Sequence, residues 1–237
     1  MALVTKDVTL QVSDGTSMGA YLARPEGAGP FPGVLVFQEI WGVNPHIRSV
    51  ADRLAERGYI ALAPELFHRT APGFQAPYTD PDPGYNHMQQ MTGAGITADL
   101  KAAYDWLMVD PICDGDRIGT LGFCLGGRVA LMANLLLPIQ ASVSFYGGGI
   151  AQTLIGQLAT LHAPALFFWA GNDAHIPPTD VQAVLDALRQ ADKDYVSTEF
   201  AKVGHGFFCD ERASYDAAAA SQAWALAQAF FSSHLSR

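Results

Sequence analysis

The chain contains little cysteine and lacks any long hydrophobic run. Its three cysteines are odd in number and have no CxxC spacing, which argues against a disulfide framework or a zinc site and favours a reducing compartment. No run reaches the roughly eighteen apolar residues that a membrane span needs, and the N-terminus lacks the basic and apolar regions of a signal peptide. We therefore expect a cytoplasmic protein that does not enter a membrane.

Positive charge is also scarce. The 14 Lys and Arg residues are outnumbered by 23 Asp and Glu residues, which gives a net charge of −9. Such a surface repels phosphate backbones, and no basic cluster counteracts it locally, so we do not expect nucleic acid as a partner. Hydrophobic residues make up 49% of the chain and charged residues 16%, a composition typical of a globular protein with a sizeable core.

The 237 residues show no composition break or linker, which predicts a single domain over residues 1–237. Two apolar stretches flank the turn dipeptide Asp14-Gly15 and predict an N-terminal antiparallel hairpin. Further apolar runs alternate with residues at helical spacing, which predicts the α/β class with a mostly parallel central sheet and helices on both faces. The expected strands are 8–12, 18–23, 33–37, 59–63, 118–121, 141–146, 165–170 and 195–200.

Residues 65–93 interrupt this alternation. The segment carries Pro72, Pro77, Pro81 and Pro83 with interspersed glycines, which predicts no long regular element through most of it. So long an excursion in a compact domain is usually a functional loop or a lid.

The sequence around Cys124 predicts a nucleophile elbow. An apolar strand pattern leads into GFCLG at residues 122–126, and a stretch with helix composition follows. Gly122 and Gly126 are needed there because the nucleophile's backbone is strained and the strand and helix nearly touch. The following helix N-terminus favours a thiolate and a developing oxyanion.

Four acidic, basic or nucleophilic residues each follow a predicted strand: Glu39, Cys124, Asp173 and His205. Because the carboxyl ends of parallel strands share one edge of a sheet, we expect these side chains to converge there. The order nucleophile, acid, histidine is that of α/β-hydrolases. His205 would act as general base and acid, and Asp173 would fix its tautomer. The alternative for Asp173 is a cap on the helix expected to begin near Pro178.

The other histidines and cysteines fit surface or packing roles better. Cys113 and Cys209 are interpreted as bystanders, although Cys209 is only four residues from His205. No second pair of ligands stands at a spacing that would make a metal site with His175, so we expect no metal. The six remaining histidines are His46, His68, His87, His162, His175 and His234, of which 68 and 87 are on the long segment and could touch substrate.

Four motifs together resemble the dienelactone hydrolase family of α/β-hydrolases. They are QEIWGVN at 38–44, GFCLGG at 122–127, GND at 171–173 and GHGF at 204–207, and the resemblance extends over essentially the whole chain. It implies a Cys124–His205–Asp173 triad that cleaves a lactone or ester through a thioester acyl-enzyme, with no cofactor. It also implies an oxyanion hole from the N–H groups of Ile40 and Leu125, with Glu39 as a carboxylate that controls the thiol.

The chain departs from that pattern in the arginines that would hold a substrate carboxylate. The resemblance implies one arginine on the long segment and one shortly after the histidine, whereas the available residues are Arg69 and Arg212. A substrate that carries a carboxylate is therefore an open question. The candidate substrate-binding residues are Trp41, Arg69, Tyr85, Phe207 and Arg212.

Other readings stay open from the sequence. A generic carboxylesterase or thioesterase would use the same residues on another ester, and a non-catalytic redox or binding protein could use Cys124 as a reactive thiol. Glu39 could be a solvated loop carboxylate or a charge favourable to a helix start. We expect a monomer acting on a small molecule, with a homodimer as the alternative.

Overall fold

The computed structural model describes residues 2–236 of the chain. The chain divides into two compact units, Met1–Gly119 and Thr120–Arg237. The boundary falls inside strand β5 (Cys113–Phe123), so no linker separates the units. A single domain over residues 1–237 stays a prediction.

The first unit begins with the expected hairpin. Strands β1 (Leu3–Gln11) and β2 (Ser17–Pro25) pair antiparallel around a turn in which Thr16 donates its backbone N–H to the Asp14 carboxylate. Strand β2 pairs antiparallel with β4 (Ile60–Pro64), and β4 pairs parallel with β3 (Phe31–Phe37). The strand order in this unit is β1-β2-β4-β3-β5.

The second unit continues from β5 with parallel strands. Its order is β5-β6-β7-β8, where β6 is Ala141–Phe145, β7 is Ala165–Ala170 and β8 is Tyr195–Phe200. Every residue of β6 and β7 is buried, as in a parallel sheet covered on both faces. The mostly parallel eight-stranded sheet with an N-terminal antiparallel hairpin is therefore confirmed.

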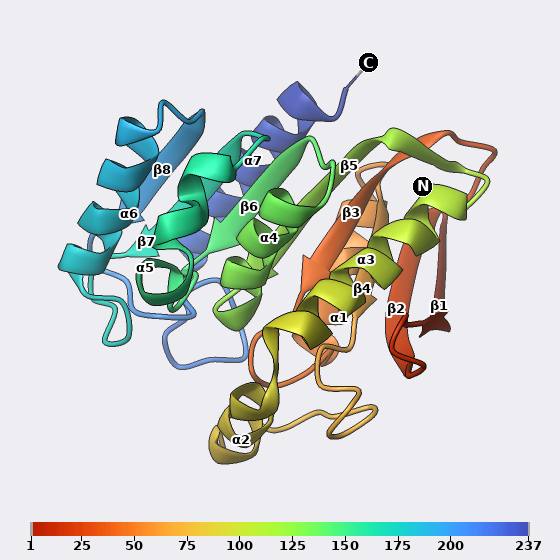
Figure 1. The fold of residues 1–237 in the computed structure, drawn as a ribbon, viewed down its shortest axis with the longest axis horizontal. Helices are drawn as coiled ribbons and strands as arrows, with labels where there is room; N and C mark the ends of the chain where they lie inside the picture. The colour runs from red at the N-terminus through yellow and green to blue at the C-terminus, as the bar shows by residue number, and fades with distance from the viewer. Residues whose placement is uncertain (1, 237) are drawn as a thin grey trace. The chain divides into compact units, whose positions relative to one another are not determined.

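Helices lie on both sides of the strands in each unit. In Figure 1, α3 passes in front of the strands of the first unit and α1 lies behind them, while α4 and α7 lie on opposite sides of β6. The helices are α1 (Pro45–Ala55), α2 (Asp82–Gln90), α3 (Gly93–Val109), α4 (Leu125–Leu136), α5 (Ile150–Thr153), the 3-10 helix η1 (Ile155–Thr160), α6 (Pro178–Gln190) and α7 (Ala217–His234). Within residues 2–236, none of them is both long and apolar enough to cross a bilayer.

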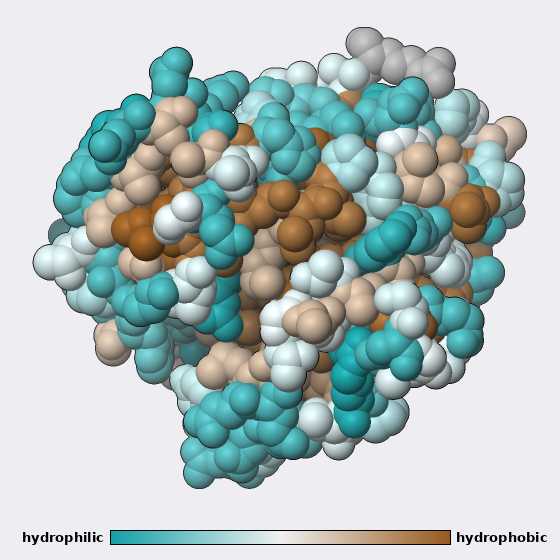
Figure 2. Space-filling model, in the orientation of Figure 1, coloured by the Kyte–Doolittle hydropathy of each residue, from teal (hydrophilic) through white to brown (hydrophobic). Residues whose placement is uncertain are grey.

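The segment 65–93 is more regular than predicted, because α2 occupies its last third. Pro83 did not prevent this helix, since it stands in the first turn, where a backbone N–H has no helical acceptor to lose. Gly84 lies so close to the Ile40 carbonyl that a Cβ would overlap it. Figure 2 shows mainly hydrophilic residues over α2, in keeping with an exposed outer face.

Hydrogen bonds and ring contacts attach the same segment to the residues after β3. Gln75 forms an antiparallel bridge with Gly42, and Asn44 donates its side-chain N–H to the Tyr78 hydroxyl at 2.8 Å. The rings of Tyr78 and Trp41 lie 4.7 Å apart between centroids. The excursion is therefore packed onto residues 41–44 within the first unit.

A buried asparagine joins three parts of the second unit. Asn134 on α4 donates to the Ser142 hydroxyl on β6 and to the Ala163 carbonyl, both at 2.9 Å. Its side-chain oxygen accepts the backbone N–H groups of His162 and Ala163. An amide satisfies all four groups because it carries both a donor and an acceptor.

We expect Asn134→Ala to lower the free energy of unfolding by about 3 kcal/mol, because it leaves buried polar groups without partners. Urea denaturation followed by circular dichroism measures the change. Leu136→Ala, at a position 48% exposed on the same helix, is the control and should have a much smaller effect. Equal losses in the two variants would contradict this role for Asn134.

Candidate active site

Cys124 stands at the turn between β5 and α4 with a strained backbone. Its φ of 54° and ψ of −114° are rarely adopted by residues with a side chain. Two hydrogen bonds hold this conformation: Cys124 donates its N–H to the Phe145 carbonyl at 3.0 Å, and Gly148 donates its N–H to the Cys124 carbonyl at 3.3 Å. The elbow geometry that the sequence predicted is present.

Close backbone packing explains the glycines of the elbow. A Cβ on Gly122 would overlap the carbonyl oxygen of Gly126, so no side chain fits there. A Cβ on Gly127 would come within 2.8 Å of the Phe145 carbonyl and of the Gly147 Cα. Leu125 is the first residue of α4, and its N–H is one of those that have no acceptor within the helix.

Asp173 uses its two carboxylate oxygens for different tasks. Oδ1 accepts the backbone N–H groups of His175 at 2.7 Å and Ile176 at 3.1 Å, which shapes the loop after β7. Oδ2 lies 2.7 Å from Nδ1 of His205. Asp173 does not cap α6, whose N-cap is Pro177, so the capping alternative is wrong.

His205 is buried and held from several directions. Ser214 donates its hydroxyl to the His205 carbonyl at 2.7 Å. The imidazole meets the rings of Tyr146 and His175 edge-on, at centroid distances of 5.0 and 4.9 Å. Sequence reasoning gave no role to Tyr146 and only a surface or packing role to His175, although both follow strands at the edge where Asp173 lies.

The charges around His205 favour its protonated form. Burial lowers the pKa of His205, but attraction to the Cys124 sulfur and hydrogen bonds to Asp173 and Cys124 outweigh it and raise the pKa to about 10. Burial likewise raises the pKa of Asp173, but its hydrogen bond and attraction to His205 hold that pKa below the usual value. The structure thus brings Cys124, His205 and Asp173 together as a coupled set.

Most of the predicted site residues of the first unit follow β3 directly, and Tyr85 lies on α2. Glu39 and Ile40 are buried, with exposed fractions of 1% and 2%, and Trp41 is also buried. Tyr85 is half-buried on α2. The roles of Glu39 and Ile40 in the reaction, and the substrate contacts of Trp41 and Tyr85, stay predictions.

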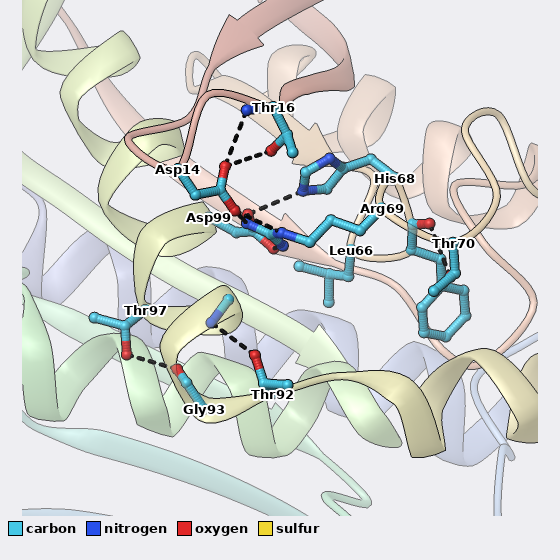
Figure 3. Close-up of polar contacts among 12 residues, drawn as sticks. Asp14, Thr16, Leu66, His68, Arg69, Thr70, Thr92, Gly93, Thr97 and Asp99 are labelled. Carbon is cyan, nitrogen blue, oxygen red and sulfur yellow. Dashed lines mark hydrogen bonds and ion pairs between the residues drawn. The ribbon is translucent and has the colours of Figure 1, made fainter.

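Arg69 has two carboxylate partners within its own unit (Figure 3). Its Nη1 and Nη2 donate to both oxygens of Asp99 at 2.7 and 2.8 Å, and its Nε donates to Asp14 at 2.8 Å. Nε2 of His68 lies 3.0 Å from Asp99, in a buried contact. This network ties the start of segment 65–93 to α3 and to the hairpin turn, so Arg69 has a structural role, and its contact with substrate stays a prediction.

Phe207 and Arg212 differ in what they can contribute. Phe207 is fully buried and packs against Tyr146 and Phe200, at centroid distances of 5.4 and 5.2 Å, so it is part of the core, and its contact with substrate stays a prediction. The guanidinium of Arg212 packs on Gly206, beside His205, where a Cβ would overlap it. Gly206 has a φ of 82°, so this position favours glycine on two counts.

Comparisons with known proteins identify the family to which the chain belongs. The family model of the dienelactone hydrolase family matches residues 18–235. A Synechocystis sp. protein provisionally named carboxymethylenebutenolidase is 35% identical over 227 residues, 92% of each chain.

Solved structures of related proteins are also similar to this chain. One provisionally named dienelactone hydrolase, from Klebsiella pneumoniae, has a TM-score of 0.89 at 31% identity and covers 98% of this chain and 99% of its own. A dienelactone hydrolase-like promiscuous phosphotriesterase from metagenomic libraries has a TM-score of 0.86 at 26% identity, with 99% of both chains covered. The protein is therefore a hydrolase of ester or lactone bonds with the α/β-hydrolase fold, and it belongs to the dienelactone hydrolase family.

Proposed function

We propose that this protein hydrolyses a small lactone or ester through a thioester formed on Cys124, with His205 as general acid and base and Asp173 as its partner. The observation that carries the proposal is the coupled set in the second unit. The Asp173 carboxylate lies 2.7 Å from Nδ1 of His205, and the imidazole is hydrogen-bonded to Cys124. Nucleophile, base and orienting acid are the parts that covalent acyl transfer requires.

At the start of acylation, the Cys124 sulfur and the His205 imidazole share one proton through their hydrogen bond. The sulfur attacks the carbonyl carbon, and the oxygen that becomes negative is stabilised by the Leu125 N–H at the start of α4. His205 then gives its Nε2 proton to the leaving oxygen as the carbon–oxygen bond breaks. The products are a thioester and an alcohol, which remain one molecule when the substrate is a lactone.

Deacylation needs a neutral imidazole, and formation of the thioester supplies it. Attraction to Cys124 is the largest influence that raises the pKa of His205, and this attraction disappears when the sulfur carries an acyl group. The pKa of His205 therefore falls in the acyl-enzyme. The imidazole can then take a proton from water, which attacks the thioester and releases the acid with the Cys124 sulfur as leaving group.

The remaining roles come from the family resemblance. They assign the second oxyanion donor to the Ile40 N–H and control of the thiol to Glu39. The candidate substrate contacts from the sequence are Trp41, Arg69, Tyr85, Phe207 and Arg212. A cytoplasmic location and a monomer stay predictions. Membership of a hydrolase family argues against a non-catalytic redox or binding protein.

Cys124→Ala should abolish turnover of p-nitrophenyl acetate, because no other group in the proposed mechanism can attack the carbonyl. Release of p-nitrophenolate measures turnover, and circular dichroism checks that the fold is intact. Cys113→Ala, at another free cysteine, is the matched control and should retain activity. Full activity in folded Cys124→Ala would overturn the mechanism.

Asp173→Asn should lower kcat/KM by about 100-fold or more and shift the alkaline limb of its pH profile toward neutral pH. The protonated imidazole exists below its pKa of about 10, and removing the Asp173 charge lowers that pKa, so the acid is lost at a lower pH. The measurement is kcat/KM for an alkyl ester between about pH 6 and 10.5, since a poor leaving group depends most on this proton.

Asp186→Asn is the control for that experiment, because it removes an exposed carboxylate of α6 whose partners, Gln182 and Arg189, lie on the same helix. Its rate profile should match that of the unmodified protein. An unshifted alkaline limb in Asp173→Asn would show that Asp173 does not govern the protonation of His205.

A further inference from the structure

His175 is an exposed side chain that contacts the buried imidazole of His205. The two rings meet edge-on, with centroids 4.9 Å apart and planes at 73° to each other. His205 is only 9% exposed, whereas His175 is open to solvent. A solvent-exposed ring gains little from packing in the core. The contact therefore constrains the ring of His205 but adds little to the stability of the fold.

Asp173 places both histidines. Its Oδ2 lies 2.7 Å from Nδ1 of His205, and its Oδ1 accepts the backbone N–H of His175 at 2.7 Å. The second bond uses only the main chain of His175, so any residue except proline can keep it. The loop thus holds its shape without the imidazole of His175, and the effect of that ring on His205 can be tested by itself.

The imidazole of His205 depends on contacts made by its ring. The neighbouring residues, Gly204 and Gly206, have no side chains that could support it. In the resting protein the ring is held by hydrogen bonds to Asp173 and Cys124. Tyr146 also contacts it, at a centroid distance of 5.0 Å, but the Tyr146 ring is fully buried and belongs to the core.

Formation of the thioester removes one of these supports. The acylated sulfur carries neither a negative charge nor a proton, so it no longer attracts the imidazole of His205 or shares a hydrogen bond with it. The bond to Asp173 remains, but it fixes only the Nδ1 side of the ring. Nε2 must still face the water that attacks the thioester, and a small misplacement of a catalytic group costs up to about 100-fold in rate.

We infer that His175 is a positioning residue for the second half of the reaction, whose ring holds the neutral imidazole of His205 in the orientation that deacylation requires. The inference rests on the proposed function, since it needs an acyl-enzyme. Aromatic rings prefer edge-on contacts at centroid distances of about 4.5–7 Å, the arrangement that the two histidines adopt. A residue without a ring at position 175 loses this contact.

The test compares His175→Ala, which removes the ring, with His175→Phe, which keeps a ring but cannot titrate. For p-nitrophenyl acetate, kcat/KM reports acylation, because release of p-nitrophenolate is the first irreversible step. At saturating substrate, kcat divided by the acetylated fraction of Cys124 gives the deacylation rate constant. Mass spectrometry of acid-quenched samples measures that fraction.

In His175→Ala the deacylation rate constant should fall about 10-fold or more, while kcat/KM changes by less than about 2-fold. His175→Phe should recover most of the loss. His162→Ala removes another exposed histidine of the second unit and should leave both constants unchanged. Circular dichroism checks that each variant is folded.

Three outcomes would overturn the inference. An unchanged deacylation rate constant in His175→Ala would mean that the ring does not position His205. Equal falls in that constant and in kcat/KM would mean that it disturbs the whole site and not one step. His175→Phe as slow as His175→Ala would mean that ring contact is not what acts. Full activity of Cys124→Ala would instead contradict the proposed function.

Discussion

The arrangement in the second unit depends on a protonated imidazole placed between a carboxylate and a sulfur. Burial of His205 alone would favour the neutral ring, but the charges of Cys124 and Asp173 reverse that preference. Asp173 in turn depends on His205, whose hydrogen bond and charge hold the pKa of the buried carboxyl below its usual value. Such a set is stable only where it is fully formed, because removing one member leaves a buried charge unpaired.

The backbone around this set is arranged to hold it. Cys124 keeps a strained conformation because its N–H and C=O are bonded to the Phe145 carbonyl and the Gly148 N–H. Asp173 is fixed by accepting two backbone N–H groups, and the carbonyl of His205 accepts the Ser214 hydroxyl. Each of these three side chains thus projects from a loop whose main chain is already hydrogen-bonded, which would limit the reorganisation that the proposed reaction requires.

Arg69 and Arg128 differ in whether carboxylates pair with their guanidinium groups. Arg69 donates hydrogen bonds to the carboxylates of Asp14 and Asp99. These bonds hold the hairpin turn, segment 65–93 and α3 together. Arg128 has no such match among residues 2–236, and it stands one turn from the nucleophile.

The sequence by itself determined the α/β class, the hairpin at Asp14-Gly15 and the elbow at Cys124, because these depend on local patterns: apolar runs, turn residues and glycines at fixed spacing. It also indicated Asp173 and His205, since strand ends in a parallel sheet share one edge. Helix α2 was missed because prolines at a helix start look the same in sequence as prolines in a loop. The partners of Arg69, the contact of His175 with His205 and the unpaired charge of Arg128 were decided only by the tertiary structure. Asp99 and His205 lie tens of residues from Arg69 and His175, the side chains they meet, and no local pattern records which distant side chain will compensate a charge or contact a ring.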